Sequence, residues 1–163
     1  MKILCIQTGG TIDKDYPKST QGWAFEIGEP AIKDVLENYK HTLEVDYEPL
    51  LRKDSTEITE EDRLLIEERI KSSDATRIII THGTDSIVET GEFLSDRNLG
   101  KIIVLTGSSL PAKFKDSDAP INIGLALGAV QVLDTGVYLA IHGLVLPIKE
   151  VSRNMDTGLF IKK

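Results

Sequence analysis

Hydrophobic residues follow two patterns that alternate along the chain. Short apolar runs are typical of buried strands, and longer stretches with apolar residues every three or four positions are typical of helices. The predicted strands are residues 2–8, 42–47, 77–81, 101–106 and 136–141, and the predicted helices are residues 29–39, 58–70, 85–96 and 118–133. Residues 144–161 resemble an irregular segment or a short hairpin. Strands and helices are therefore expected to alternate along most of the chain.

Most of the predicted strands are nearly continuous apolar runs, and residues 42–47 are the exception that alternates polar and apolar residues. Nearly continuous apolar strands are typical of parallel sheets that are covered by helices on both faces. We therefore predict the α/β class, with a doubly wound, mostly parallel sheet between two helical layers. The chain has no segment with the composition of an interdomain linker. Residues 1–163 are predicted to form one domain, without a second domain at the C-terminal end.

Residues 13–28 differ from the rest of the chain because they follow neither pattern. This segment includes Tyr16, Pro17, Gly22 and Trp23. A connection of this length inside a compact domain is commonly a lid over a binding site or a disordered loop. We predict a mobile lid loop.

Composition and charge narrow the class of protein. The 163 residues are 40% hydrophobic and 28% charged, which is typical of a folded domain and unlike a disordered or membrane-spanning chain. The formal net charge of −7 disfavours contact with phosphate groups, so we expect neither nucleic acid nor a membrane as a partner. The single cysteine, Cys5, lies in an apolar run, which favours a buried small side chain and a reducing compartment. With an N-terminal apolar run too short for a signal peptide, we predict a cytoplasmic location.

The sequence offers no pattern for a bound metal or nucleotide. His41, His82 and His142 are widely spaced, and the Cys/His spacing of a zinc site does not occur. The glycine spacings that bind nucleotide phosphates do not follow the predicted strands. We therefore expect no metal and no cofactor.

Small and hydroxyl-bearing residues follow three of the predicted strands, as Thr8-Gly9-Gly10-Thr11, Thr81-His82-Gly83-Thr84-Asp85 and Thr106-Gly107-Ser108-Ser109. Such residues are also common in ordinary turns, so one such segment alone carries little weight. Ligands bind beyond the carboxyl ends of the strands in an open parallel sheet, and there two Thr-x-Gly-Thr turns could flank one substrate. The Gly-x-Ser-x-Gly pattern of serine hydrolases is missing. A nucleophile at this edge would therefore be threonine.

The segments Thr8-Gly9-Gly10-Thr11-Ile12 and Thr81-His82-Gly83-Thr84-Asp85 resemble the two signature segments of the L-asparaginase family. Two further stretches agree with the family pattern: Asp54-Ser55-Thr56, and Thr106-Gly107-Ser108 followed by Asp118-Ala119-Pro120-Ile121-Asn122. The resemblance covers essentially the whole chain but only the larger N-terminal domain of typical members. In this respect the chain is similar to short, single-domain asparaginases.

The resemblance implies hydrolysis of a side-chain amide through a covalent acyl-enzyme. Thr11 corresponds to the nucleophile, Thr84 to the second threonine and Asp85 to the carboxylate that also grips the α-amino group of the substrate. Asp85 also begins a predicted helix, where a negative charge is favourable in any case. The expected substrate is L-asparagine or L-glutamine. The substrate-binding residues implied in this way are Gly10, Ser55, Thr56, Gly83 and Ser108.

Arg153 is a departure from the family pattern, because it stands where the family has a catalytic lysine. Arginine keeps its proton in proteins, so it can orient groups or stabilise charge but cannot act as a general base. Lys149, four residues earlier, is a second candidate for the role of the lysine. Neither His82 nor His142 is a convincing replacement, and His82 is expected to pack or hydrogen-bond structurally.

The lid is a second departure. Tyr16 has the phenol that the family uses to help activate its nucleophile but follows Thr11 closely, whereas Trp23 matches the spacing of short-lid members and has no hydroxyl. Either residue could close over a substrate, and Trp23 with Phe25 could simply pin the loop onto the core.

Three functions remain open at this point. The first is an asparaginase-type threonine amidohydrolase, expected to be a homodimer or a higher homo-oligomer that covers the open site. The second is a catalytically weakened amino-acid-binding or regulatory module on the same scaffold. The third is an amidase domain that supplies ammonia to an amidotransferase partner.

Overall fold

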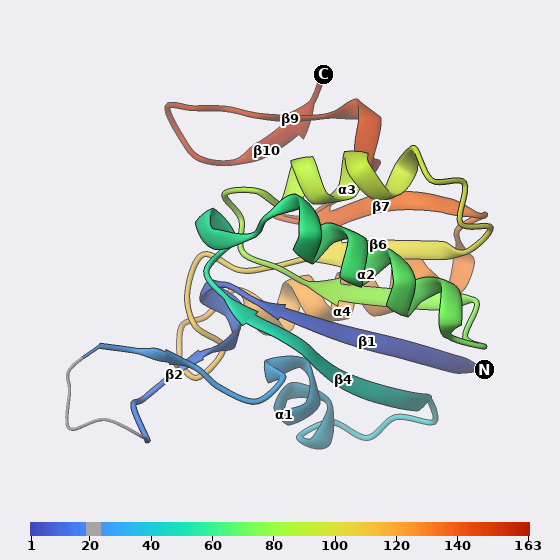
Figure 1. Cartoon of the computed structure of the whole chain (residues 1–163). Helices are drawn as coiled ribbons and strands as arrows, with labels where there is room; N and C mark the ends of the chain where they lie inside the picture. The colour runs from blue at the N-terminus through green and yellow to red at the C-terminus, as the bar shows by residue number, and fades with distance from the viewer. Residues whose placement is uncertain (19–23) are drawn as a thin grey trace.

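The structure, a computed structural model, describes residues 1–18 and 24–163 of the chain. Its centre is a six-stranded sheet with the strand order β4-β1-β5-β6-β7-β8 (Figure 1). The strands from β4 to β7 in this order pair in parallel, and β8 pairs antiparallel with β7. The strands of this sheet are β1 (Lys2–Gly9), β4 (Glu44–Lys53), β5 (Arg77–Thr81), β6 (Ile102–Thr106), β7 (Gly136–Ile141) and β8 (Leu144–Pro147).

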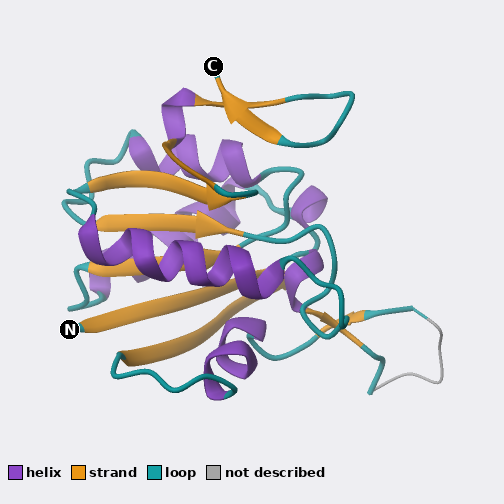
Figure 2. Cartoon of the chain, turned by 180° about the vertical axis from the view of Figure 1, so that it is seen from behind, coloured by secondary structure: helices purple, strands orange, loops and turns teal. Residues whose placement is uncertain are grey.

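Helices cover both faces of this sheet (Figures 1 and 2). Successive side chains of a strand point to opposite faces, so β1 places Ile3 and Cys5 in one core and Leu4 and Ile6 in the other. The first core packs against α1 (Ala31–Glu37) and α4 (Ala119–Val132), and the second against α2 (Glu60–Ser72) and α3 (Ile87–Ser95). The predicted three-layer α/β arrangement is confirmed.

One predicted strand is longer in the structure, and the C-terminal tail is more ordered than its pattern alone defines. The strand predicted to end at residue 47 continues as β4 to Lys53, through Pro49. Because β4 is an edge strand, a proline that cannot donate a hydrogen bond is tolerated there. The C-terminal tail adds β8 to the main sheet and then forms a hairpin of β9 (Val151–Arg153) and β10 (Phe160–Lys162), which was one of the two predicted alternatives.

The segment predicted as a lid begins and ends in a small antiparallel sheet of β2 (Lys14–Asp15) and β3 (Glu26–Ile27). Figures 1 and 2 show that the described part of this segment, with β2 and β3, extends away from the main sheet. Its base is fixed, because the Gly28 N–H donates to the Asp13 carbonyl (2.8 Å) and the Gln7 amide donates to the Gly28 carbonyl (3.0 Å). Residues 19–23, which include Trp23, lie outside the described residues, and the motion of the lid stays a prediction.

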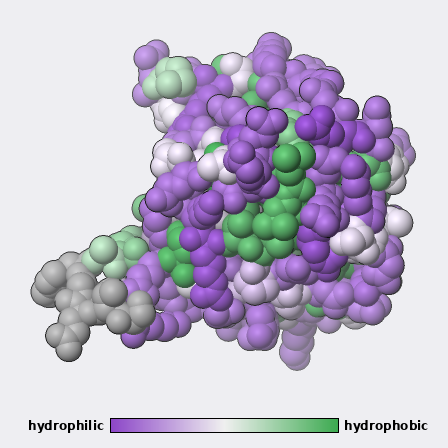
Figure 3. Space-filling model, in the orientation of Figure 1, coloured by the Kyte–Doolittle hydropathy of each residue, from purple (hydrophilic) through white to green (hydrophobic). Residues whose placement is uncertain are grey.

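The surface and the single cysteine fit the sequence analysis. The face seen in Figure 3 is mostly hydrophilic, with its largest hydrophobic area near the centre. None of the helices described is long and apolar enough to cross a bilayer. Cys5 is buried, and burial raises the pKa of its thiol to about 12, so the thiol is a packing group.

Candidate active site

Glycine residues bring three loops into direct contact at the carboxyl edge of the sheet. A Cβ on Gly10 would lie 2.2 Å from the Gly83 Cα, and a Cβ on Gly83 would lie 2.6 Å from both the Cβ and the Oγ of Ser55. Gly10 also has φ +81, a backbone conformation that favours glycine. Only residues without a side chain allow this approach. The contact therefore brings together the three loops that carry Thr11, Thr84 and Ser55.

The two Thr-x-Gly-Thr turns are braced against each other by their first threonines. The Thr8 hydroxyl donates to the Thr81 carbonyl (2.8 Å), and the Thr81 hydroxyl donates to Asp13 Oδ2 (3.1 Å). The last threonines differ, since the hydroxyls of Thr11 and Thr84 make no hydrogen bond within the described part of the chain. Thr11 begins the short 3-10 helix η1 (Thr11–Asp13), and both residues are half-buried. The first threonine of each turn is thus structural, and the last is free to meet a ligand.

Ser55 and Asp85 form the next part of the site. Ser55 begins the 3-10 helix η2 (Ser55–Glu57); its Oγ accepts the Asp85 backbone N–H (3.3 Å) and lies 3.5 Å from Asp85 Oδ2. Thr56 is exposed, and its hydroxyl donates to Asp54 Oδ1 (3.2 Å). The structure therefore places Ser55 at the threonine turns, while Thr56 turns to Asp54.

The loop after β6 adds Gly107 and Ser108. A Cβ on Gly107 would lie 2.4 Å from the His82 carbonyl oxygen and 3.6 Å from Thr84 Cγ2, so this loop adjoins the second turn. Ser108 is buried, and its hydroxyl donates to the Leu110 carbonyl. Asp118 holds the loop by accepting the backbone N–H groups of Ser109 and Leu110. The substrate-binding role of Ser108 stays a prediction, because its hydroxyl already has a structural partner.

Arg153 reaches this site from β9. Its Nη1 donates to Asp85 Oδ1 (3.1 Å) and to the Thr84 carbonyl (3.4 Å), and its Nε donates to the Gly158 carbonyl (3.2 Å). Lys149, the alternative from the sequence, forms an exposed ion pair with Asp96 (2.7 Å) at the C-terminal end of α3. Because Thr84 and Asp85 precede the N-terminal end of α3, Lys149 is placed away from the threonines. Of the two candidates, Arg153 contacts the second threonine turn and Lys149 does not. The catalytic role of Arg153 stays a prediction.

Tyr16 lies in the lid with its side chain exposed. Its ring packs against Phe25, and Phe25 packs against Phe114, each at 5.6 Å between ring centroids. Among the described residues the Tyr16 phenol makes no hydrogen bond to Thr11. Phe25 thus anchors the lid to the loop after β6, and the catalytic role of Tyr16 stays a prediction.

Asp13 is a buried carboxyl group that the sequence analysis did not single out. It lies two residues after Thr11, is 2% exposed, and accepts the Ala31 N–H (2.8 Å) at the start of α1 in addition to the Thr81 hydroxyl. Burial raises the pKa of Asp13 to about 7, although these hydrogen bonds act in the opposite direction. Polar residues in a loop are usually solvated, so the sequence carried no signal for this one.

His82 is the corresponding buried group of the second turn. Its Nδ1 lies 2.8 Å from the Gly83 carbonyl, so this nitrogen carries the proton, and its Nε2 then accepts the Thr90 hydroxyl (2.9 Å). Burial lowers the pKa of His82 to about 4. His82 is therefore a neutral, structurally bonded side chain, as expected. His142 is stacked on Phe160 and accepts the Phe160 N–H (3.4 Å).

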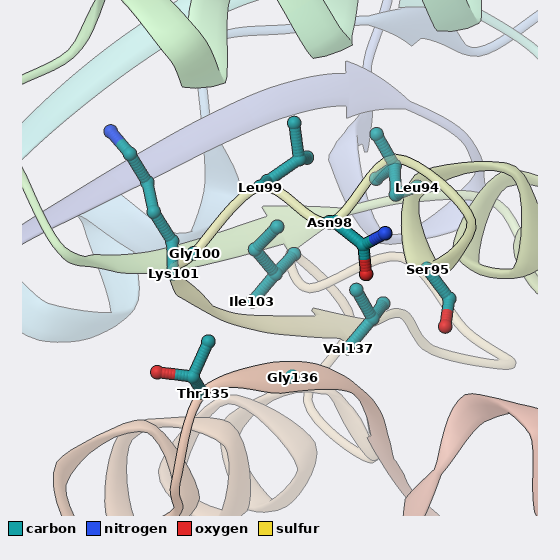
Figure 4. A pocket seen from close by; sticks show the side chains of 10 residues that line it. All are labelled: Leu94, Ser95, Asn98, Leu99, Gly100, Lys101, Ile103, Thr135, Gly136 and Val137. Carbon is teal, nitrogen blue, oxygen red and sulfur yellow. The ribbon is translucent and has the colours of Figure 1, made fainter.

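A separate hollow lies at the opposite edge of the sheet (Figure 4). Its volume is about 240 Å³, and Figure 4 shows Asn98, Lys101, Ile103 and Val137 among its lining residues. These residues belong to the amino ends of β6 and β7 and to the loop after α3, so this hollow is distinct from the threonine turns. No group of three or more His, Cys, Asp or Glu residues in the described ranges is arranged to hold a metal ion.

An α/β sheet with two contacting loops at its carboxyl edge, each presenting a free threonine hydroxyl, is an arrangement that suits a threonine-nucleophile enzyme. A family model described as "Asparaginase, N-terminal" matches residues 2–159. The chain belongs to the asparaginase family, as its two signature segments predicted.

Known relatives agree with this membership. The L-asparaginase of Thermococcus kodakarensis is 32% identical over 167 residues, covering 98% of this chain and 49% of that protein. L-asparaginase 1 of Escherichia coli strain K12 is 36% identical over 168 residues, covering 97% of this chain and 45% of that protein. The solved structure of the thermostable L-asparaginase from Thermococcus kodakarensis has a TM-score of 0.88 at 29% identity, covering 99% of this chain and 51% of that chain.

A relative that matches a shorter part of the chain belongs to a different kind of enzyme. A glutamyl-tRNA(Gln) amidotransferase subunit of Methanococcus vannielii is 33% identical over 99 residues, covering 60% of this chain and 22% of that protein. The chain spans about half the length of the L-asparaginases that it matches.

Proposed function

We propose that this chain hydrolyses a small carboxamide of the asparagine type to the carboxylate and ammonia, with Thr11 as the nucleophile. The observation that carries this proposal is the contact between Gly10 and Gly83, which brings together two turns with free threonine hydroxyls at the ligand-binding edge of the sheet. Family membership supports hydrolysis of an amide. The threonine mechanism and the particular amide are part of the proposal.

In the proposed first step the Thr11 oxygen attacks the amide carbon, and the carbon–nitrogen bond breaks. The proton of Thr11 passes through the Thr84 hydroxyl to the leaving nitrogen, which departs as ammonia. Water then attacks the Thr11 ester, releases the carboxylic acid and returns a proton to Thr11. Because the guanidinium of Arg153 keeps its proton, its role is to hold Asp85 and to balance negative charge.

The test is ammonia release from L-asparagine and L-glutamine by the wild type and by Thr11→Ala. Turnover by the wild type that disappears in a folded Thr11→Ala supports the proposal. Thr42→Ala is the matched control, because Thr42 is exposed and precedes β4 at the opposite edge of the sheet. A folded wild type that releases no ammonia from any small amide contradicts it.

The ion pair between Arg153 and Asp85 favours a second candidate, a binding module without turnover. Such a module would be stabilised by its ligand while releasing no ammonia. A ligand at 100 times its dissociation constant stabilises a fold by about 2.7 kcal/mol, which a thermal-shift assay detects. The same assay, run with each amide, separates this candidate from the enzyme.

The match to an amidotransferase subunit favours a third candidate, an amidase that delivers ammonia to a partner enzyme. Copurification of a stoichiometric partner, together with turnover that depends on this partner, would distinguish it from an independent amidohydrolase.

A further inference from the structure

The guanidinium of Arg153 is held firmly beside the second threonine turn. Two carbonyl groups and the Asp85 carboxylate accept its Nε and Nη1 protons, and its central carbon lies 5.5 Å from the centre of the Phe160 ring. Its Nη2 has no hydrogen-bond partner within the described ranges, and 30% of the side chain is exposed. Arg153 therefore offers a fixed positive group with one free edge.

The carboxylates around the site are already engaged. Asp85 pairs with Arg153 (3.1 Å), and Asp54, which adjoins Ser55, pairs with Lys14 (3.0 Å). Asp118, which adjoins the loop of Ser108, accepts two backbone N–H groups. The guanidinium of Arg153 already balances the charge of Asp85, so an ammonium group on a ligand at this carboxylate would be repelled by the guanidinium. A carboxylate group on a ligand would instead be attracted to Arg153, because a planar guanidinium binds carboxylates well.

We propose that Arg153 makes this site select amides that carry a carboxylate and lack an ammonium group, which are ω-amido acids of the succinamate type, over zwitterionic L-asparagine. This inference rests on the proposed function in taking the threonine turns as the binding site. In this arrangement the carboxylate of the ligand lies on the free edge of Arg153, and its amide lies at Thr11. Arg153 is then a specificity-determining residue.

The experiment measures binding of succinamate and of L-asparagine by calorimetry, and their kcat/KM values by ammonia release. Wild-type protein is expected to bind succinamate at least about tenfold more tightly than L-asparagine. In Arg153→Met, which keeps the length of the side chain but loses its charge, Asp85 becomes free for an ammonium group. The preference is then expected to fall by about tenfold or more and to turn toward L-asparagine.

A matched control exists in the same chain. Arg97 also lies over a phenylalanine (Phe93, 4.2 Å) and pairs with a carboxylate (Glu67, 3.1 Å), but at the far end of α3. Arg97→Met is expected to leave the ratio of the two affinities unchanged. If Arg153→Met does not fold, Asp85→Asn is the second test. This variant removes the charged partner of Arg153 but keeps the guanidinium, so it is expected to keep the preference for succinamate over L-asparagine.

The outcomes separate this inference from the proposed function. Tight succinamate binding without ammonia release supports the ligand class and contradicts hydrolysis. Turnover with a preference for L-asparagine in the wild type supports hydrolysis and overturns the role of Arg153. The inference is also overturned if neither ligand binds at millimolar concentration, if the ratio is unchanged in a folded Arg153→Met, or if Asp85→Asn loses its preference for succinamate.

Discussion

The two threonine turns share the pattern Thr-x-Gly-Thr, but they are built differently. The first turn has Gly9 at φ +107 and Gly10 at φ +81, and it leads into η1 and the lid. The second turn has no positive φ; it is fixed by the hydrogen bonds of His82 and leads into α3. The two turns thus have the same sequence pattern but different supports. The first depends on the backbone conformation of its glycines, and the second depends on the buried side chain of His82.

Gly10→Ala should have the largest effect, because it adds a Cβ 2.2 Å from the Gly83 Cα at a position with positive φ. Overpacking and left-handed strain together are expected to cost about 3 kcal/mol or more of unfolding free energy, measured by urea denaturation. Gly100→Ala is the control, since Gly100 also has positive φ (+67) but has no atom within 4 Å of the added Cβ. Equal losses in the two variants would mean that the contact between the turns carries no energy.

Thr84→Val should mainly affect chemistry, because the Thr84 hydroxyl makes no hydrogen bond within the described part of the chain. Loss of a proton relay is expected to lower kcat by about 10²-fold, which corresponds to about 2.7 kcal/mol in the barrier. Stability should change little. Thr81→Val is the comparison, since Thr81 donates to buried Asp13 and its loss should lower stability first. A kcat for Thr84→Val equal to that of the wild type would remove Thr84 from the mechanism.

His82→Gln should destabilise the second turn by about 2 kcal/mol at neutral pH, because a fitted, buried hydrogen-bonding group is replaced. It should also change the dependence of stability on pH. Since burial lowers the pKa of His82 to about 4, the wild type loses stability as pH falls from about 6.5 toward 4, and the variant lacks this loss. Denaturation at pH 4.5 and pH 7 measures the difference. His41→Gln, at an exposed position, should keep the pH dependence of the wild type.

Much of the fold was predictable, because its elements depend on local patterns. The helix predicted over residues 58–70 is α2, and its start is set by the reciprocal capping of Thr59 and Asp62. The end of β4 was missed because an edge strand carries a proline and polar residues that its pattern alone cannot assign. The place of β8 beside β7 depends on a pairing between strands, which the sequence pattern does not contain.

Only those parts of the site that lie within short sequence motifs were predictable. The glycines and threonines of the two turns are adjacent in sequence, so their pattern could be recognised. The partners of Arg153 are not predictable in this way, because Asp85 and Arg153 are brought together by the hairpin of β9 and β10 over α3. Asp13 was missed for a similar reason, since its burial depends on Ala31 and Thr81.

Asp13→Asn should have the smallest effect on folding stability. The pH dependence that Asp13 gives to stability should be opposite to that of His82. Because burial raises the pKa of Asp13 to about 7, its folded form holds a proton more tightly than the unfolded chain, and the wild type loses stability as pH rises from about 4 toward 7. Asparagine cannot ionise, but it can still accept the Ala31 N–H. The variant is therefore expected to be about 1 kcal/mol less stable than the wild type at pH 5, with a smaller or reversed difference at pH 8. Asp134→Asn, at an exposed position, should show no such crossing. If the difference in unfolding free energy between wild type and Asp13→Asn is the same at pH 5 and pH 8, Asp13 does not titrate in this range. Asp13 and His82 would then not have opposite effects on the pH dependence of stability.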